Sequence, residues 1–452
     1  MNIDPNIALT RLNATSVAHR TVVEIDHAGD RGNQIKYRQV SLSTDQVLER
    51  SKHASGFAGS LRPGDPAEVT YEFSNRAETG ATTSRFTETQ KGVIRETLNN
   101  FSDAANIRFK ESVNAKSHHM QFKVDGSSFK WQAPWYAPVS DDQPGRVLVT
   151  LNQGHVDGLE KPNNFGRHVI AKATAFKLGL PDPAPTASQS KYAENTLAYT
   201  LRSPFLENRS DHRFNKSHGE GNQYSSTPMM DDIALMQDRF GVNLQTRTGD
   251  TTYGFNSNAD REVFKLASGD DLPLFCVWDA GGKDTFDFSA FKQDQVVNLR
   301  SGSFSNVGGG IGNVSIANGV TIERAIGGAG NDILIGNDVG NELEGGEGDD
   351  IFYVKANSGT NKLTGGPGKN TFVIGANDSS VSLGSTTITD FVSGKDKLDT
   401  SALRAAHPQL TVTSEYYRSH KLTLLRFDFD GDKNEDFIMS ISGRIARSDF
   451  RV

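Results

Sequence analysis

The chain has 452 residues, which is enough for two or three domains with sizeable cores. Its formal net charge is −7, its mean hydropathy is −0.51 and its single cysteine is Cys276. The mild acidity gives no reason to expect a nucleic-acid partner, and one cysteine excludes an intrachain disulfide. No run approaches the roughly 20 apolar residues of a transmembrane helix, and no cleaved signal peptide is expected at the polar N-terminus.

The first half of the chain predicts a mixture of strands and helices. Residues 1–60 are polar with weak periodicity and are taken as an N-terminal segment. Alternating or apolar runs then predict strands at 68–73, 107–110, 120–124 and 146–151. Helical patterns predict helices at 87–102, 165–178 and 230–240, the last two ending near Gly179 and Gly241. This mixture favours an α/β or α+β domain up to about residue 242.

The composition changes after residue 245, because glycine rises and helical patterns stop. We therefore place a domain boundary at 243–247. Residues 327–335 read Gly-Gly-Ala-Gly-Asn-Asp-Ile-Leu-Ile, and residues 345–353 read Gly-Gly-Glu-Gly-Asp-Asp-Ile-Phe-Tyr. Both match the nonapeptide repeat of a calcium-binding parallel β-roll. The unit at 336–344 has lost its central aspartate, and 365–373 is a weakened copy.

The repeat has a direct physical reason. Glycines allow tight turns with positive φ, aspartates add hard anionic oxygens, and calcium prefers six to eight oxygen ligands. A flexible glycine linker would not explain the apolar residue at a fixed offset. We expect several calcium ions, and folding that is coupled to calcium outside the cell. The acidic run 428–436 resembles the start of an EF-hand loop but lacks its glycine and final glutamate, so an acidic surface turn is favoured.

Longer stretches are similar to a known family. They include Thr246–Asn258, Val277–Phe288, Gly312–Ala317, Ile388–Asp399 and Pro228–Ala234. From about residue 65 to its end, the chain resembles the serralysins, RTX-type secreted zinc metalloproteases of the metzincin clan. The resemblance implies an N-terminal α/β metzincin-like (zincin) domain, then an all-β parallel β-roll with a β-sandwich-like end. The corresponding segments are a propeptide-like 1–60, a protease-like 61–245 and a roll with secretion signal at 246–452.

The resemblance also implies a set of calcium residues. They are Arg247, Gly249, Thr251, Asp279, Gly281, Asp284, Thr321, Glu323, Gly328, Gly330, Asp332, Gly345, Glu347, Asp349, Asp350, Asp390 and Asp399. The C-terminal Asp449-Phe450-Arg451-Val452 is similar to the signal read by a type I ABC exporter, although Arg451 replaces an apolar residue. Secretion to the extracellular space by that route, without a cleaved signal peptide, is the expectation.

The zinc site of the family is missing from this sequence. The family pattern H-E-x-x-H-x-x-G-x-x-H needs two histidines on one helix face, a general base and a third histidine. Lys172, Ala173, Phe176 and Asp182 stand at those four positions, while Arg202 and Pro204 stand in the Met-turn. Independently of register, none of the 11 histidines precedes a glutamate, and no two are four residues apart. The pairs His118-His119 and His212 with His218 remain possible metal pairs, with solvated loops favoured.

These observations predict a catalytically degenerate serralysin, or pseudoprotease, without zinc. One hypothesis is a monomeric secreted binding protein or effector that uses the basic, partly apolar cleft against a host or competitor protein. The cleft residues could equally just fill a relict site, and the loop 207–218 is a second candidate surface. Alternatives are a hydrolase with non-family chemistry, residual metallopeptidase activity, and a decoy or inhibitor related to an active sister protease. Without self-cleavage, residues 1 to about 50 are expected to persist.

Overall fold

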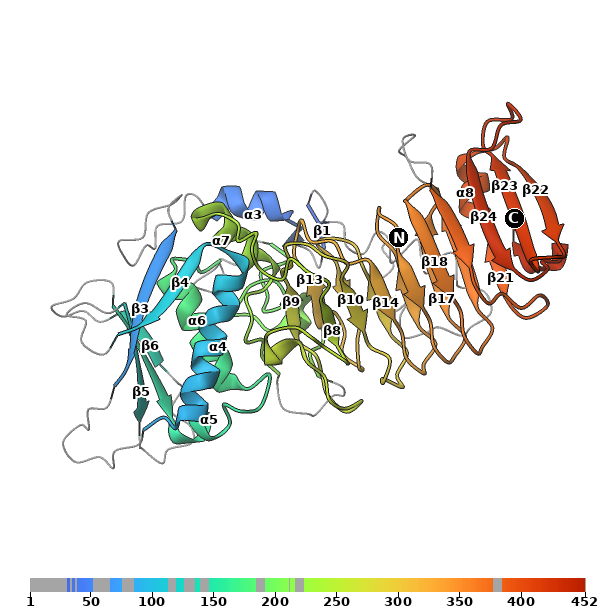
Figure 1. Ribbon diagram of the computed structural model, residues 1–452. Coiled ribbons are helices and arrows are strands. Elements are labelled where there is room, and N and C mark those ends of the chain that lie inside the picture. Colours follow the sequence, from blue (N-terminus) through green and yellow to red (C-terminus); the bar gives the residue numbers. More distant parts are fainter. Residues whose placement is uncertain are drawn as a thin grey trace.

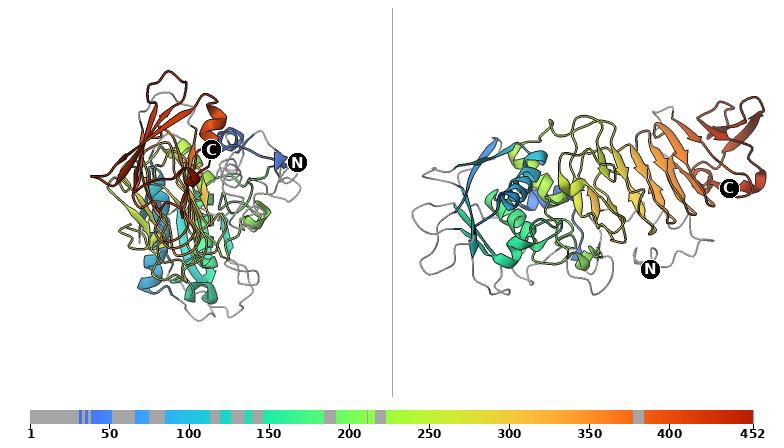
Figure 2. Two further views of the ribbon diagram at one scale, coloured as in Figure 1. Left: turned by 90° about the vertical axis from the view of Figure 1, so that its right-hand side faces the viewer. Right: turned by 60° about the horizontal axis from the view of Figure 1, so that its bottom comes forward.

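The computed structural model of this protein is elongated, with an α/β part at one end and a stack of short strands towards the C-terminus (Figure 1). The right-hand view of Figure 2 shows that the strands of this stack follow one another along the length of the molecule. The structure describes residues 31–32, 35–36, 39–51, 66–74, 85–112, 119–125, 135–138, 146–183, 192–210, 212–215, 223–376 and 384–451. The predicted N-terminal segment is therefore described only from residue 31 onwards.

A five-stranded sheet in the order β4-β3-β5-β7-β6 forms one layer of the N-terminal part. Its strands are β3 (Ala67–Phe73), β4 (Ile107–Glu111), β5 (Met120–Asp125), β6 (Trp135–Pro138) and β7 (Val147–Asn152). All pairs are parallel except β6 with β7. The four predicted strands are confirmed. The sequence reading missed β6, whose Pro138 lacks an amide donor and is tolerated because β6 lies at the sheet edge.

Helices α4 (Glu88–Ala104) and α6 (Phe165–Lys177) pack against each other and against this sheet. Thr87 caps α4, since its Oγ1 accepts the Gln90 N–H at 3.2 Å while Gln90 Oε1 accepts the Thr87 N–H at 2.9 Å. Helix α7 (Met230–Phe240) ends at Gly241, and the short α5 (Gln153–Asp157) precedes α6. The three predicted helices are confirmed.

The described part of the N-terminal segment packs against the α/β part. It contains β1 (Ile35–Lys36), β2 (Gln39–Val40) and α3 (Thr44–Ser51). Val40 forms a parallel bridge with Tyr192, and α3 packs against α7. Arg31 and Asp231 form a buried ion pair, with the Arg31 Nη1 to Asp231 Oδ1 distance at 2.7 Å. The contacts made by residues 31–51 therefore tie this segment into the α/β part.

The chain beyond residue 251 alternates between two facing sheets. One has nine strands: β8 (Thr252–Gly254), β10 (Thr285–Asp287), β14 (Arg324–Ile326), β16 (Glu342–Glu344), β18 (Thr360–Thr364), β20 (Ser385–Ile388), β24 (Phe437–Ser442), β23 (Leu422–Asp428) and β22 (Thr411–Tyr417). The other has six: β11 (Val296–Asn298), β15 (Ile333–Ile335), β17 (Ile351–Lys355), β19 (Thr371–Gly375), β21 (Lys397–Asp399) and β25 (Phe450–Arg451). This arrangement confirms the predicted parallel β-roll.

Apolar side chains fill the space between the two sheets. Leu334, Phe352 and Phe372 occupy successive coils on one side, and all three are fully buried. The Phe352 and Phe372 rings stack with centroids 5.0 Å apart. Each coil therefore buries its apolar residue on the next one, as the fixed offset in the repeats predicts.

Two smaller features complete the roll. A three-stranded sheet of β9 (Phe275–Val277), β12 (Phe304–Ser305) and β13 (Val314–Ile316) lies beside the first coils, and Cys276 is buried in β9 as predicted. At the C-terminal end, α8 (Ser401–Ala406) precedes β22 to β24, which pair antiparallel and extend the nine-stranded sheet.

Candidate functional site

Helix α6 carries the first three residues that the resemblance places at the family's zinc and general-base positions, Lys172, Ala173 and Phe176. Lys172 and Phe176 are one helical turn apart and half-buried, whereas Ala173 is fully buried in the core. Lys172 Nζ donates a hydrogen bond to the Ser203 carbonyl at 3.1 Å. Burial lowers the pKa of Lys172, and the nearby Arg202 charge lowers it further. The Lys172 ammonium is therefore partly shielded from solvent, and its hydrogen bond to Ser203 connects α6 to the segment 200–205.

Arg202 lies opposite α6. Its side chain is buried, and its Nε donates to the Leu180 carbonyl at 3.2 Å. Its guanidinium carbon is 5.1 Å from the centroid of the Phe176 ring, which is a cation–π distance. The structure thus brings Lys172, Phe176 and Arg202 together, with Pro204 exposed beside them. Asp182 lies exposed beyond the helix, and its charge counteracts the lowering of the Lys172 pKa.

Two turns hold these residues in place. Gly179 follows α6 with φ of 77°, and the Leu180 N–H reaches back to the Ala175 carbonyl at 3.0 Å. On the opposite side, Asp232 of α7 accepts hydrogen bonds from Thr200 Oγ1 at 2.7 Å and from the Leu201 N–H at 2.8 Å. Burial raises the pKa of Asp232 to about 6. The sequence reading missed Asp232, because nothing in its spacing points to residues 200–201.

The residues gathered around Lys172 do not fit a zinc ion. Zinc takes imidazole nitrogen, thiolate or carboxylate ligands, usually four in tetrahedral geometry. Among Lys172, Ala173, Phe176 and Asp182, the Asp182 carboxylate alone has ligand chemistry, and two cationic side chains lie close by. A dication placed there would meet their positive charges at short range.

The histidines that the structure describes do not supply the missing zinc ligands. His168 on α6 is buried, and its Nδ1 lies 3.0 Å from the Ser225 carbonyl. His119 Nδ1 accepts the Thr70 N–H at 3.1 Å, and His212 Nδ1 lies 2.8 Å from the Ser210 carbonyl. His118 and His218 lie outside the described residues, so the two possible metal pairs stay untested.

The turns of the roll form two edges, which we name by one residue each. The Asp284 edge contains the turns that lead into the nine-stranded sheet, and the Asp350 edge contains those that lead into the six-stranded sheet. Predicted calcium residues on the Asp284 edge are Arg247, Gly249, Thr251, Asp279, Gly281, Asp284, Thr321 and Glu323. Those on the Asp350 edge are Gly328, Gly330, Asp332, Gly345, Glu347, Asp349, Asp350 and Asp390. Asp399, at the end of β21, lies towards the Asp284 edge and thus away from Asp390.

The Asp284 edge concentrates carboxylates. Asp284 Oδ1 accepts the Thr251 N–H at 2.8 Å, and the Asp284 N–H donates to Glu323 Oε2 at 2.7 Å. Asp279 accepts the Tyr253 hydroxyl at 2.6 Å. Burial raises the pKa of Asp284 to about 7, and the charges of Asp279 and Glu323 add to that effect. The Asp284 Oδ2 atom is buried without a hydrogen-bond partner among the described residues.

The Asp350 edge shows the same features. The Asp332 N–H donates to Asp350 Oδ1 at 2.8 Å, while Asp350 Oδ2 is buried and has no partner in the described part of the chain. Burial raises the pKa of Asp350 to about 8, and the Asp332 charge adds to it. A Cβ on Gly346 would lie 2.0 Å from the Gly328 carbonyl oxygen, so this position in the stacked turns has room for glycine only.

These turns fit calcium. Asp284, Asp350 and Asp399 each keep one buried carboxylate oxygen that has no hydrogen-bond partner among the described residues, and an uncompensated buried anion is costly. Bound calcium would supply the missing positive charge and accept carbonyl and carboxylate oxygens together. Asp390 differs, because its two oxygens already accept the Gly365 and Gly366 N–H groups at 2.8 and 2.7 Å. The side chains of Glu347 and Asp349 are exposed.

The acidic run 428–436 forms the exposed connection between β23 and β24, as predicted for a surface turn. Oxygens of Asp428, Asp430 and Asp432 lie within 4.8 Å of one another. These carboxylates already accept backbone N–H groups, including that of Gly431 at 2.7 Å. Among the candidate contact residues 207–218, Arg213 pairs with Ile311 of the roll, so part of that loop is packed rather than free.

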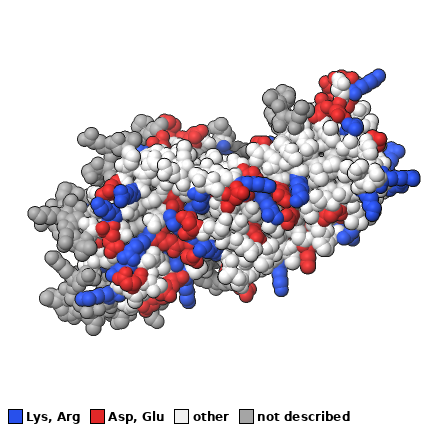
Figure 3. Space-filling model, viewed as in Figure 1, with Lys and Arg blue, Asp and Glu red and all other residues white. Residues whose placement is uncertain are grey.

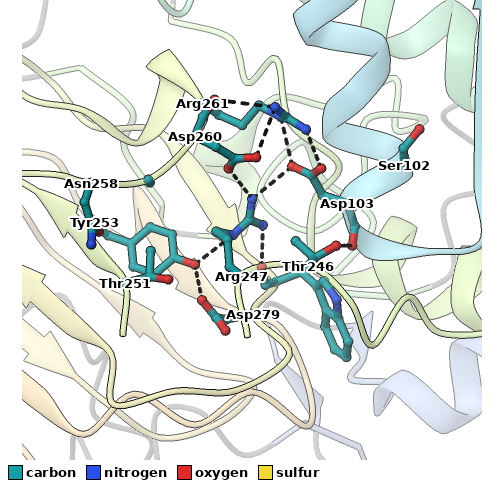
Figure 4. A network of polar contacts seen from close by, with 12 residues as sticks. Ser102, Asp103, Thr246, Arg247, Thr251, Tyr253, Asn258, Asp260, Arg261 and Asp279 are labelled. Carbon is teal, nitrogen blue, oxygen red and sulfur yellow. Dashed lines mark hydrogen bonds and ion pairs between the residues drawn. The ribbon is translucent and has the colours of Figure 1, made fainter. Parts of the chain in front are cut away.

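A polar network joins the α/β part to the roll at the predicted boundary (Figure 4). Arg247 donates to Asp103 of α4 and to Asp260, both at 3.0 Å, and to the Trp278 carbonyl at 2.6 Å. Arg261 reaches the other Asp103 oxygen at 2.7 Å. Arg247 Nε also contacts the Tyr253 hydroxyl at 3.0 Å, and that hydroxyl bonds Asp279. The network therefore runs from α4 to the predicted calcium residues, a role of the Arg247 side chain that the sequence reading missed.

The α/β part, the parallel roll and its glycine–aspartate turns define an RTX-type protein with the domain order of a secreted metalloprotease. Residues 242–452 match the family described as Peptidase M10 serralysin C terminal. The chain is 36% identical to metalloprotease AprA of Pseudomonas entomophila over 94% of this chain and 93% of that one. It is 39% identical to a serralysin of Photorhabdus laumondii over 82% and 78%, and 37% identical to serralysin B of Dickeya chrysanthemi over 86% and 85%. The chain belongs to the serralysin family.

Other comparisons add less. The solved AlgE6R2 subunit of the Azotobacter vinelandii mannuronan C5-epimerase covers 37% of this chain and 91% of its own, with 20% identity and a TM-score of 0.20. That likeness carries no argument. Among the described residues, no helix has the length and apolar character needed to cross a membrane.

Proposed function

We propose that this chain is a secreted serralysin-family pseudoprotease that binds calcium, lacks catalytic zinc and acts by binding another protein. The observation that carries the proposal is the pair of cations, Lys172 and Arg202, at the family's zinc site. Both side chains bond main-chain carbonyls of their own domain. This favours the view that they fill the old metal site rather than grip an acidic peptide.

A partner would then meet the exposed and half-buried apolar residues beside Lys172 and Arg202, which we call the rim. Pro204 is exposed, Phe176 and Phe205 are half-buried, and Leu206 is 37% exposed. Apolar side chains of this kind are the usual centre of a protein interface. On the face seen in Figure 3, acidic and basic side chains are interspersed. That face therefore has no large patch of one charge that would attract a partner of the opposite charge. We propose a host or competitor protein as the target.

Export is part of the same proposal. The C-terminal residues would be read by a type I ABC exporter, and the roll would fold on meeting calcium outside the cell. The inference is that the export and calcium-folding parts of the family are kept while the catalytic part is not.

Metal content and hydrolysis test the loss of catalysis. Elemental analysis of the purified full chain should give several calcium ions and no stoichiometric zinc, and a casein assay should show no zinc-dependent cleavage. The matched gain-of-function variant is Lys172→His/Ala173→Glu/Phe176→His/Asp182→His with Arg202→Met, which should bind zinc. One zinc per wild-type chain, or cleavage abolished by a zinc chelator in excess calcium, would overturn the proposal.

The binding surface has its own test. Leu206→Glu should abolish capture of the target from host lysate, because it places a charge in the apolar rim. Val339→Glu, on the roll, is the matched control, since Val339 is 40% exposed against 37% for Leu206. Capture that survives Leu206→Glu unchanged would rule out the cleft rim as the binding surface.

A further inference from the structure

Along the Asp350 edge, the last residue of each turn bridges to the coil before it. Asp332 Oδ1 accepts the Gln295 N–H at 2.8 Å, and Asp350 Oδ1 accepts the Asp332 N–H at the same distance. Asn370 Oδ1 then accepts the Asp350 N–H at 3.0 Å. Asp396 Oδ1 accepts the Asn370 N–H at 2.9 Å. In each of these turns the Oδ1 atom thus accepts a main-chain N–H of the coil before it. The turns differ in the other terminal atom of this side chain, which is Oδ2 in aspartate and Nδ2 in asparagine.

In the turn at 365–370 that other terminal atom is an amide nitrogen. Ile351 pairs with Thr371, so Asn370 occupies in its coil the position that Asp350 occupies one coil earlier. Asp350 Oδ2 has no partner within the described residues, whereas Asn370 Nδ2 donates to the Gly366 carbonyl of its own turn at 3.0 Å. The Asn370 amide therefore donates a hydrogen bond to a turn carbonyl, where bound calcium would place a positive charge.

The turn at 365–370 is also less negatively charged than the turn at 345–350. Lys369 stands where Asp349 stands one coil earlier, and the turn Gly-Gly-Pro-Gly-Lys-Asn holds no carboxylate. The carboxylates that reach it from other turns, those of Asp349, Asp390 and Asp396, each already accept at least one N–H group of this turn. A divalent cation there would gain no free anionic oxygen from the turn and would meet a lysine charge.

The opposite edge repeats the exchange in the same coils. Thr285 pairs with Arg324, and Glu342 with Lys362, so Asp284 and Glu323 occupy the position held later by Asn341 and Asn361. Asn361 Oδ1 accepts the Asn341 N–H at 2.9 Å, and Asn361 Nδ2 donates to Ser358 Oγ at 3.2 Å. Asn341 Nδ2 donates to Asn337 Oδ1 at 2.9 Å. Amides thus replace carboxylates at Asn341 and Asn361 on the Asp284 edge and at Asn370 on the Asp350 edge.

We propose that the amides of Asn341, Asn361 and Asn370, not calcium, close the turns at 336–341, 356–361 and 365–370, so that the calcium demand of this roll falls on its other turns. The coils that carry these three turns then keep their fold when calcium is scarce, and the calcium-dependent coils add to them. Full burial of Leu363 and Phe372 gives these coils a core of their own. The inference rests on the proposed calcium binding but is independent of whether the chain cleaves proteins.

Hydrogen exchange on the full chain tests this directly. In calcium chloride, amides of both β14–β15 and β18–β19 should be protected. After removal of calcium with EGTA, β14–β15 should lose protection while β18–β19 keeps it. Simultaneous loss of protection in both pairs of strands would overturn the inference. Elemental analysis of the same sample separates the two proposals, because a protein without calcium defeats calcium binding itself.

A gain-of-site variant gives a second readout. Lys369→Asp/Asn370→Asp recreates the Gly-Gly-x-Gly-Asp-Asp turn, so it should bind one calcium ion more than the wild type and lose protection of β18–β19 in EGTA. Asn331→Asp is the matched control, because this exposed side chain lies on the same edge and its oxygen can still accept the Asp349 N–H. It should leave both the stoichiometry and the EGTA response unchanged. An unchanged stoichiometry in the folded double variant would contradict the role given to Asn370.

Discussion

At the scale of single residues, two cations connect separate segments of the α/β part by hydrogen bonds. Lys172 ties α6 to Ser203, and Arg202 ties the segment after Tyr199 to Leu180 beyond the helix. The ties formed by hydrogen bonds need no metal, so chelators should not loosen this part of the molecule.

Arg202→Ala should lower the free energy of unfolding by about 2 kcal/mol, because it leaves the buried Leu180 carbonyl without this donor and removes the contact with Phe176. Urea denaturation in excess calcium measures the change. Arg404→Ala is the control, since Arg404 is exposed and bonds the Leu410 carbonyl at 3.4 Å. Equal effects of the two substitutions would show that Arg202 does not tie the cleft.

His168 predicts an acid-sensitive step. Burial, together with the nearby Lys172 charge, lowers the pKa of His168 to about 4, so the folded protein holds the imidazole neutral. For a lowered pKa, stability is present above the unfolded pKa of about 6.5 and is lost as pH falls through about 4. The contribution is at most about 3 kcal/mol. His168→Gln should flatten the loss of stability between pH 6.5 and 4 in excess calcium, measured as the difference from wild type. Parallel curves for the two proteins would exclude His168 as a source of the loss.

At the scale of elements, the sequence predicted the helices and the roll because their signals are local. The capping residues of α4, the glycine after α6 and the nonapeptide units all act within a few residues. The cleft was predicted in its composition, but the partners of its cations were not. Ser203 and Leu180 act through main-chain carbonyls, which carry no sequence signal. Strand β6 was missed for a similar reason, since its place at an edge is set by the sheet.

The joint between α4 and the roll is also invisible in sequence, because Asp103 and Arg247 are 144 residues apart. Asp103→Ala should lower the free energy of unfolding by about 3 kcal/mol, since it removes the more buried of the two carboxylates that pair with both Arg247 and Arg261 and leaves them the more exposed Asp260. Glu111→Ala removes an ion pair with Arg95 at a site that is about one-third exposed, and should cost less than about 1 kcal/mol. Equal losses in the free energy of unfolding for both variants would show that the Asp103 contacts between α4 and the roll stabilise the protein no more than a surface ion pair does.

At the scale of the whole molecule, the described N-terminal segment contacts both parts of the protein. Arg31 is held by Asp231 of α7, and Thr44 Oγ1 accepts a hydrogen bond from Asn318 of the roll at 2.9 Å. Ser41 donates to Glu194 at 2.6 Å. A segment with these contacts stabilises the molecule that retains it, which gives a physical reason for residues 31–51 to persist after secretion.

Arg31→Met tests that reason. It leaves the buried Asp231 carboxylate without its partner, so the segment should detach more often and trypsin should cleave after Arg50 faster than in wild type. Limited proteolysis with mass spectrometry, in excess calcium to keep the roll folded, follows that single cut. Arg418→Met is the control, because Arg418 is exposed at the tip of the β22–β23 hairpin and its loss should leave cleavage after Arg50 unchanged. A cleavage rate that Arg31→Met does not alter would mean that the Arg31–Asp231 pair does not hold the segment in place.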